Sequence, residues 1–200
     1  EYKKNVKIID ELGESYSIDL KEFPFIPNYK FKSIKKILTT QKNGINVIYS
    51  SSIYDTRKLK DKKKSPHLHP VVHTITQDKI TYWYTNDTLK GHFGVPKILL
   101  NFNEKQYSHQ EQNDYRGKYG MSQITFGIPI SSKKEGELIL KAINTSEFKE
   151  IIKATKWGAF VTEWRMFTYF KKDFWKEFVD SPKSLSLPKK TQKKRKIKSV

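Results

Sequence analysis

The chain has 200 residues, in which 39 lysines and arginines stand against 21 aspartates and glutamates, a formal net charge of +18. This balance favours a polyanionic partner, most commonly nucleic acid; the alternative is a surface of solvated lysines. No cysteine is present, which excludes a disulfide framework and thiolate zinc sites and fits a reducing compartment. No apolar run approaches about 18 residues and no signal-peptide pattern opens the chain, so the sequence indicates neither a membrane span nor export.

Composition divides the chain into three expected parts: an N-terminal strand and hairpin segment (1–19), a main domain (20–180) and a basic tail (181–200). Aromatic residues make up 14% of the chain, enough to build a core for the main domain. Low hydrophobicity and uniform positive charge predict that the tail is disordered. It is either a nonspecific polyanion binder or a nuclear-targeting signal. The first residue is Glu1 rather than Met, which is consistent with a fragment or processed piece of a longer protein.

The first expected elements are a hairpin and a helix. Val6–Ile9 and Tyr16–Leu20 flank a turn at Gly13 and have the composition of paired strands. A connector containing two prolines, Phe23–Asn28, is expected to run extended into the core. Asn28 is the expected N-cap of the helix that follows. Helical spacing is shown by Phe31, Ile34, Ile37 and Leu38.

A strand, a charged block and a hairpin follow. Ile45–Ser50 has the composition of a strand, and Lys58–Lys64 is so highly charged that we expect a mobile surface loop. Near DNA such a block acts through counterion release rather than by reading sequence. Val71–Ile75 and Ile80–Thr85 predict two strands of a hairpin.

Three histidines near this hairpin raise the question of a metal site. His67, His69 and His73 share parity, so on an extended chain all three face the same way, as a three-histidine metal site requires. Pro66 and Pro70 interrupt a regular strand, and no carboxylate lies close in sequence. We therefore expect surface or core histidines and no metal.

The best core strand, Val95–Phe102, is flanked by two glycine-bracketed turns, Gly91–Gly94 and Asp114–Met121. Glycine is favoured where the backbone takes positive φ or approaches another segment closely. Loops on a rigid scaffold are the usual position of binding residues. The side chains that these turns offer are His92, Arg116, Lys118 and Tyr119. The alternative is two ordinary turns with solvated charges.

The C-terminal third alternates apolar elements. Ile124–Ile130 predicts a buried strand, and Glu135–Asn144 predicts an amphipathic helix. Thr145 or Ser146 is expected to cap a second helix, which buries Phe148, Ile151, Ile152 and Ala154. The aromatic block 157–178 is typical of a core rather than of a cofactor site. Cations bordering this block that could reach a backbone phosphate are Arg165, Lys171 and Lys172.

Catalytic motifs are not evident in the sequence. We find no glycine-rich phosphate loop, no G-x-S-x-G elbow, no cysteine nucleophile and no paired acids supported by a lysine. The composition is therefore that of a reader of nucleic acid rather than of a catalyst.

Several short motifs together resemble a known family. They are Tyr82-Trp83-Tyr84, the runs 91–98 and 117–121, the trailing runs 163–167 and 171–175, and the entry segment 25–28. The combination, over about residues 20 to 178, resembles the C-terminal target-recognition (specificity) domain of adenine-N6 DNA methyltransferases. These enzymes belong to type II and type IIG restriction–modification systems.

This resemblance implies an α+β fold, with a curved mixed β-sheet that carries packed helices and is laid into the major groove of double-stranded DNA. It implies the non-catalytic part of such an enzyme, because neither the cofactor-binding glycine motif nor the Asn-Pro-Pro-Tyr/Phe tetrad occurs here. No cofactor is expected on this chain; S-adenosylmethionine would bind a catalytic half, supplied by another methyltransferase or nuclease domain or subunit. The expected DNA-binding residues are Arg57, Tyr84, Lys90, His92, Arg116, Lys118, Tyr119, Lys171 and Lys172.

Two other functional classes remain open from the sequence. A nonspecific nucleic-acid-binding or packaging protein, of a virion or nucleoid, would bind through charge alone. A metal-dependent nuclease would use the histidines and bind metal tightly. The expected location is cytoplasmic or nucleoid-associated, or nuclear or virion if the basic tail is a targeting signal.

Overall fold

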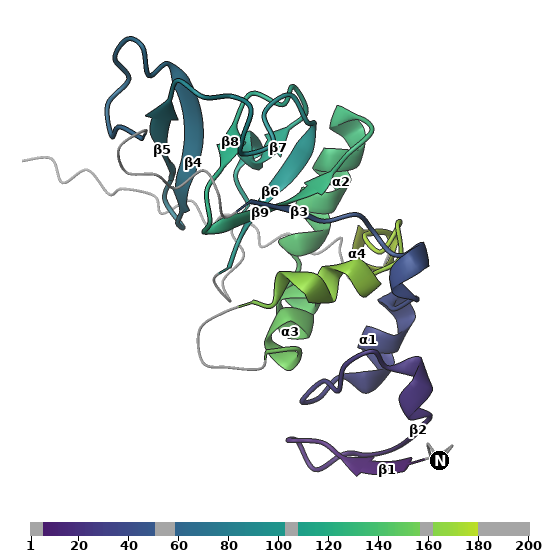
Figure 1. Ribbon diagram of the computed structural model, residues 1–200. Helices are drawn as coiled ribbons and strands as arrows, with labels where there is room; N and C mark the ends of the chain where they lie inside the picture. Colours follow the sequence, from purple (N-terminus) through teal and green to yellow (C-terminus); the bar gives the residue numbers. More distant parts are fainter. Residues whose placement is uncertain (1–5, 51–58, 103–107, 157–161, 180–200) are drawn as a thin grey trace, which may run out of the picture.

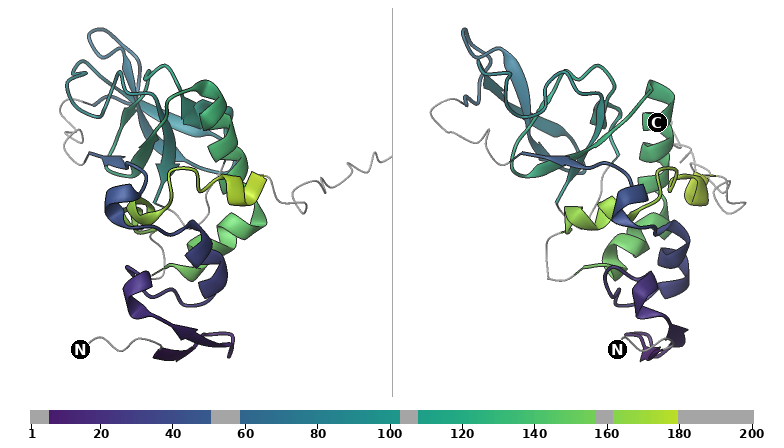
Figure 2. Two further views of the ribbon diagram at one scale, coloured as in Figure 1. Left: turned by 90° about the vertical axis from the view of Figure 1, so that its right-hand side faces the viewer. Right: turned by 45° about the vertical axis from the view of Figure 1, so that its right-hand side comes forward.

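The computed structural model describes residues 6–50, 59–102, 108–156 and 162–179. It contains both helices and strands, and it confirms the predicted α+β class. Most strands gather at one end of the molecule, a small N-terminal hairpin lies at the other, and α1, α3 and α4 lie between them (Figure 1). The same order is visible in the two rotated views (Figure 2). Arg57 and the predicted disordered tail lie outside the described residues.

The strands are divided among three sheets rather than joined in one. The N-terminal hairpin pairs β1 (Val6–Ile9) with β2 (Ser15–Ile18). The four-stranded sheet is antiparallel, in the order β3 (Ile48–Tyr49), β9 (Thr125–Pro129), β6 (Lys97–Asn101) and β7 (Asn113–Asp114). The three-stranded sheet has the order β5 (Ile80–Thr85), β4 (His69–Ile75) and β8 (Gly120–Met121), with β8 parallel to β4.

β6 is buried on both faces because it lies between two hydrophobic layers. Ile98 and Leu100 belong to the main core on the helical side, whereas Leu99 packs with Val72 and Met121 of the three-stranded sheet. The alternation follows from the two-residue period of a strand. A strand that is covered on both sides has a continuous apolar sequence, and this pattern predicted the strand at β6.

The helix α2 packs against the other side of the four-stranded sheet, and α1, α3 and α4 extend the same hydrophobic core away from it. The helices are α1 (Phe31–Ile37), α2 (Lys133–Ile143), α3 (Ser146–Ala154) and α4 (Lys176–Val179). Ser132 and Thr145 cap α2 and α3 by accepting backbone N–H donors three residues on, so the predicted Thr145 cap is confirmed. None of the helices in the described part of the chain is long and apolar enough to cross a membrane.

The expected cap of α1 is wrong. Lys30 occupies the N-cap position with a left-handed backbone (φ 62°), and no side chain caps the helix. Asn28 is engaged elsewhere: its Nδ2 donates to the carbonyl of Lys156 at 3.0 Å, and its backbone N–H donates to Ala154 O at 2.7 Å. The asparagine thus ties the connector to the end of α3, a long-range contact that local spacing does not reveal.

The aromatic block is core, as expected, over its described residues. Phe167, Phe170, Phe174 and Phe178 surround Phe148 of α3, with ring centroids between 5.3 and 6.5 Å from its own. Part of this block folds as a 3₁₀ helix, η4 (Trp164–Tyr169). The residues 157–161 lie outside the described part of the chain.

Two strand and loop assignments need correction. The strand expected at Ile45–Ser50 is only Ile48–Tyr49, because Ile45 N–H donates instead to Phe170 O at 2.9 Å. The charged block is anchored at its start rather than free: Leu59 is buried, and Lys60 exchanges both backbone hydrogen bonds with Tyr84 at the edge of β5 (2.9 and 2.7 Å). An unpaired strand edge provides the donors and acceptors for this contact.

The three histidines do not form a cluster. A register irregularity between Val72 and Thr74 breaks the parity along β4. His73 stacks on Trp83 with ring centroids 4.5 Å apart, and His69 lies 6.1 Å from the ring of Phe93. Within the described ranges no three metal-ligating side chains of the His, Cys, Asp or Glu type lie together.

Candidate nucleic-acid interface

The two glycine turns, hereafter the paired turns (Gly91–Gly94 and Asp114–Met121), are bonded directly to each other. Gly94 N–H donates to Gly117 O, and Met121 N–H donates to Gly91 O, both at 2.8 Å. Gly117 has a left-handed backbone (φ 65°), and a Cβ placed there would lie 2.5 Å from the carbonyl carbon of Gly94. Both the conformation and the close approach therefore require glycine.

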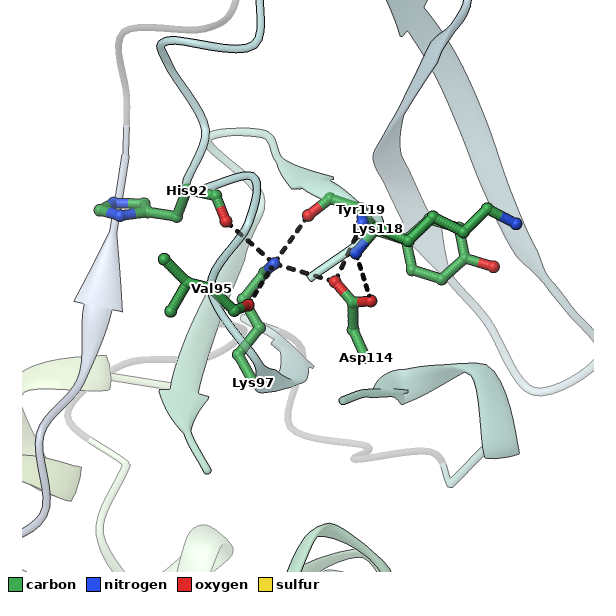
Figure 3. Close-up of polar contacts among 6 residues, drawn as sticks. All are labelled: His92, Val95, Lys97, Asp114, Lys118 and Tyr119. Carbon is green, nitrogen blue, oxygen red and sulfur yellow. Dashed lines mark hydrogen bonds and ion pairs between the residues drawn. The ribbon is translucent and has the colours of Figure 1, made fainter. Parts of the chain in front are cut away.

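A buried lysine lies between the paired turns. Lys97, the first residue of β6, faces Asp114 of β7 in register, and its side chain is inaccessible to solvent. Its Nζ donates to Asp114 Oδ2 at 2.9 Å and to the carbonyls of His92 (3.0 Å), Val95 (3.1 Å) and Tyr119 (2.7 Å), as Figure 3 shows. One carboxylate and three carbonyls are a suitable acceptor set for a protonated ammonium.

Burial lowers the pKa of the Lys97 ammonium, while the Asp114 carboxylate acts in the opposite direction and favours the charged form. The Asp114 carboxylate also accepts hydrogen bonds from the second turn. Asp114 Oδ1 accepts the backbone N–H of Lys118 at 2.7 Å, and Oδ2 accepts that of Tyr119 at 2.9 Å. The ion pair therefore fixes the backbone of both turns at once, and removing one partner leaves an uncompensated buried charge.

The fixed turn presents cations and aromatic rings to solvent. Arg116 and Lys118 are exposed, and within the described residues neither has a carboxylate partner. Lys118 Nζ lies 5.1 Å from the ring centre of Tyr119, which stacks on Tyr82 at 5.0 Å. The guanidinium of Arg116 lies 5.4 Å from the ring of Tyr115.

A depression of about 360 Å³ runs beside these side chains. Its lining includes Tyr115, Arg116, Lys118 and Tyr119, together with the carboxylate of Glu111. Burial raises the pKa of Tyr82, the ring beneath Tyr119, and the neighbouring tyrosine adds to this effect. The tyrosine therefore stays neutral and acts as a stacking support.

His92 is held away from these side chains. Its ring lies on the opposite side of the Lys97 ammonium from Lys118 and Tyr119 (Figure 3), and Nε2 lies 3.2 Å from the carbonyl oxygen of Tyr49 on β3. His92 has a left-handed backbone (φ 57°), which is uncommon for a residue other than glycine. The histidine connects the first turn to β3, and we therefore do not include it among the proposed DNA contacts.

The remaining expected contacts lie elsewhere. Lys171 and Lys172 belong to the segment after η4, which pairs with the chain near Gly44 in the helical part of the molecule. Tyr84 is half-buried at the β5 edge that pairs with Lys60, and Lys90 is exposed just before the first turn. Arg57 is not among the described residues. The structure thus places Arg116, Lys118 and Tyr119 on one turn, whereas the other described residues of the set lie on other segments.

The sequence does not reveal that the paired turns depend on two particular residues. It places Lys97 in the core strand and Asp114 at the start of the second turn, without a link between them. One feature of the sequence points to the pair. A lysine inside an otherwise apolar run requires a counter-charge when it is buried, and few aspartates lie close to Lys97 in the sequence.

Comparison with known proteins finds no matching family model, curated protein or solved structure. The resemblance to target-recognition domains therefore stays a prediction, and function must be argued from the chemistry of the site.

Proposed function

We propose that this chain is a sequence-specific DNA-binding module that reads double-stranded DNA through the paired turns. In this proposal it is the target-recognition part of a restriction–modification-type adenine-N6 DNA methyltransferase. S-adenosylmethionine and the catalytic residues belong to another domain or subunit. The proposal joins the resemblance of the sequence to the chemistry of one exposed turn.

One observation carries the proposal: Arg116 and Lys118 are exposed on a turn whose backbone is fixed by the buried Lys97–Asp114 pair. Reading a base edge requires donors held in one geometry, because paired donors must meet paired acceptors such as O6 and N7 of guanine. Surface lysines on mobile segments add affinity for any phosphate backbone without choosing a sequence. The net charge of +18 supplies long-range attraction to DNA.

The test begins with selection of duplexes from a random pool by the intact chain. We expect a preferred site, and we expect Arg116→Ala to flatten the preference by about 1–3 kcal/mol of discrimination against wrong bases. A triple alanine variant of Lys62, Lys63 and Lys64 is the matched comparison. It should weaken binding to all duplexes alike and reduce the slope of log affinity against log salt.

The opposite result identifies the alternative function. If no preferred site emerges, or if both variants lose affinity equally on every duplex, binding is driven by charge alone. The chain would then be a nonspecific nucleic-acid-binding or packaging protein, which its basic composition also favours.

A further inference from the structure

A second positively charged surface lies in the helical part of the molecule. A groove of about 390 Å³, hereafter the lysine groove, is lined by polar and cationic side chains together with Ile45 and Val47, and none of its described lining residues is a carboxylate. The side chains that matter here are Gln41, Lys42, Asn46, Thr168 and Lys172. We propose that the lysine groove binds the phosphodiester backbone of the same DNA duplex that the paired turns read.

The backbone determines that the two lysines share one groove. The chain around Lys42 pairs with the end of η4 through three hydrogen bonds: Thr39 N–H to Tyr169 O (2.7 Å), Ile45 N–H to Phe170 O (2.9 Å) and Lys171 N–H to Ile37 O (2.8 Å). Gly44 permits this approach, because a Cβ at that position would lie 1.8 Å from Thr168 O. Two segments far apart in sequence are thus fixed side by side.

The chemistry of the lining matches a phosphate backbone. Lysine, glutamine, asparagine and threonine side chains are the usual donors to phosphate oxygens, and such contacts position a protein on DNA without reading sequence. Lys42 and Lys172 are exposed, and neither forms an ion pair with another described residue. The acid next in sequence, Asp173, forms an ion pair with Lys176 at 3.1 Å, which offsets its negative charge.

The lysine groove is close enough to the paired turns to share a duplex. Asn46 precedes Tyr49 by three residues, roughly 10 Å of extended chain. The Tyr49 carbonyl in turn lies 3.2 Å from His92 of the first turn. One turn of B-form DNA spans about 34 Å, so a duplex on the paired turns extends well beyond this distance. The inference rests on the proposed function, since it concerns the same DNA.

Another groove of the molecule is less suited to a phosphate. A depression between α1 and α3 also has lysines in its lining, but Glu147, Glu150 and Glu177 are among its residues. These carboxylates would repel a phosphate. The described lining of the lysine groove has no such carboxylate, so its two lysines face a phosphate without this repulsion.

The test is a salt titration of duplex binding by Lys42→Ala/Lys172→Ala. Each neutralised phosphate contributes about 0.9 to the slope of log affinity against log salt, so the slope should decrease by about 1.8. Affinity should fall by the same factor for the preferred and the scrambled duplex. Asn46→Asp, which places a negative charge in the groove at nearly constant volume, should likewise weaken both.

The matched control is Lys141→Ala/Lys153→Ala, which removes the same charge from exposed positions on α2 and α3 outside the groove. A change in slope no larger than that of this control would overturn the proposal. A changed sequence preference in the groove variant would overturn it too. If the groove variant keeps its slope while Arg116→Ala still flattens sequence preference, the inference fails and the proposed function stands. If the unaltered chain prefers no sequence, the proposed function fails, and the slope of the groove variant still decides whether the groove binds phosphate.

Discussion

The paired turns and the lysine groove both expose cations, but they are built differently. In the paired turns a buried ion pair holds the backbone beneath Arg116 and Lys118. In addition to the ion pair, Lys97 Nζ donates three hydrogen bonds to backbone carbonyls, and the Asp114 carboxylate accepts two from backbone N–H groups. In the lysine groove, backbone hydrogen bonds between two segments position the two lysines, and the lysine side chains are exposed.

This difference corresponds to two demands of DNA recognition. A base edge is read by donors in one fixed arrangement, and fixing them in advance lowers the entropy lost on binding. A phosphate backbone tolerates several arrangements of flexible lysines, because the attraction is largely electrostatic.

The largest effect is expected from Lys97→Met. Methionine fills a similar volume but leaves the Asp114 carboxylate buried without its counter-charge, so the free energy of unfolding should fall by about 3–5 kcal/mol. Urea denaturation measures the loss. Lys153→Ala is the control, since it removes an exposed ion pair with Glu150 (2.7 Å) and should cost about 1 kcal/mol or less. Equal losses in the two variants would show that the Lys97 pair does not hold the turns.

A smaller effect is expected from Gly117→Ala. The new methyl group would meet the backbone of Gly94, and the backbone of Gly117 itself is left-handed (φ 65°), which adds strain for alanine. We expect a loss of about 1–3 kcal/mol in the free energy of unfolding. Sequence preference on DNA should fall with it, because Arg116 and Lys118 flank the altered residue.

Gly94→Ala is the matched control for this prediction. Its backbone is also left-handed (φ 75°), but a Cβ there would meet open space. Its loss therefore reports the conformational strain alone, about 1–2 kcal/mol. If the two variants are equally stable, the close approach of the turns contributes nothing.

Much of the fold was predictable because it depends on local periodicity. The alternation in β6 and the spacing of apolar residues in α2 and α3 are imposed by the geometry of one element, so a short window of sequence contains them. The Thr145 cap is local as well. These elements were expected close to their observed bounds.

What escaped prediction depends on contacts between distant segments. Asn28 is a good cap by composition, yet a carbonyl 128 residues later engages its side chain. The division of the strands into separate sheets depends on which edges meet, which periodicity does not record. At the site, the turns were expected, but their union through Lys97 and Asp114 requires a register between β6 and β7 that the sequence does not specify.

The smallest effect concerns His92, which connects the first turn to β3 through the carbonyl of Tyr49. His92→Ala removes this hydrogen bond, for which a net loss of about 0.5–1.5 kcal/mol is expected, and keeps the left-handed backbone. His92→Gly removes the same bond but relieves the backbone strain. The glycine variant should therefore be more stable than the alanine variant by about 1–2 kcal/mol, as measured by urea denaturation.

Duplex titrations of the same two variants then separate a positioning role of His92 from direct contact with DNA. If His92 only positions the first turn, the glycine and alanine variants should differ in DNA affinity as they differ in stability. If His92 touches DNA directly, as the sequence suggested, both variants should lose the same affinity whatever their stability, and the positioning role is wrong.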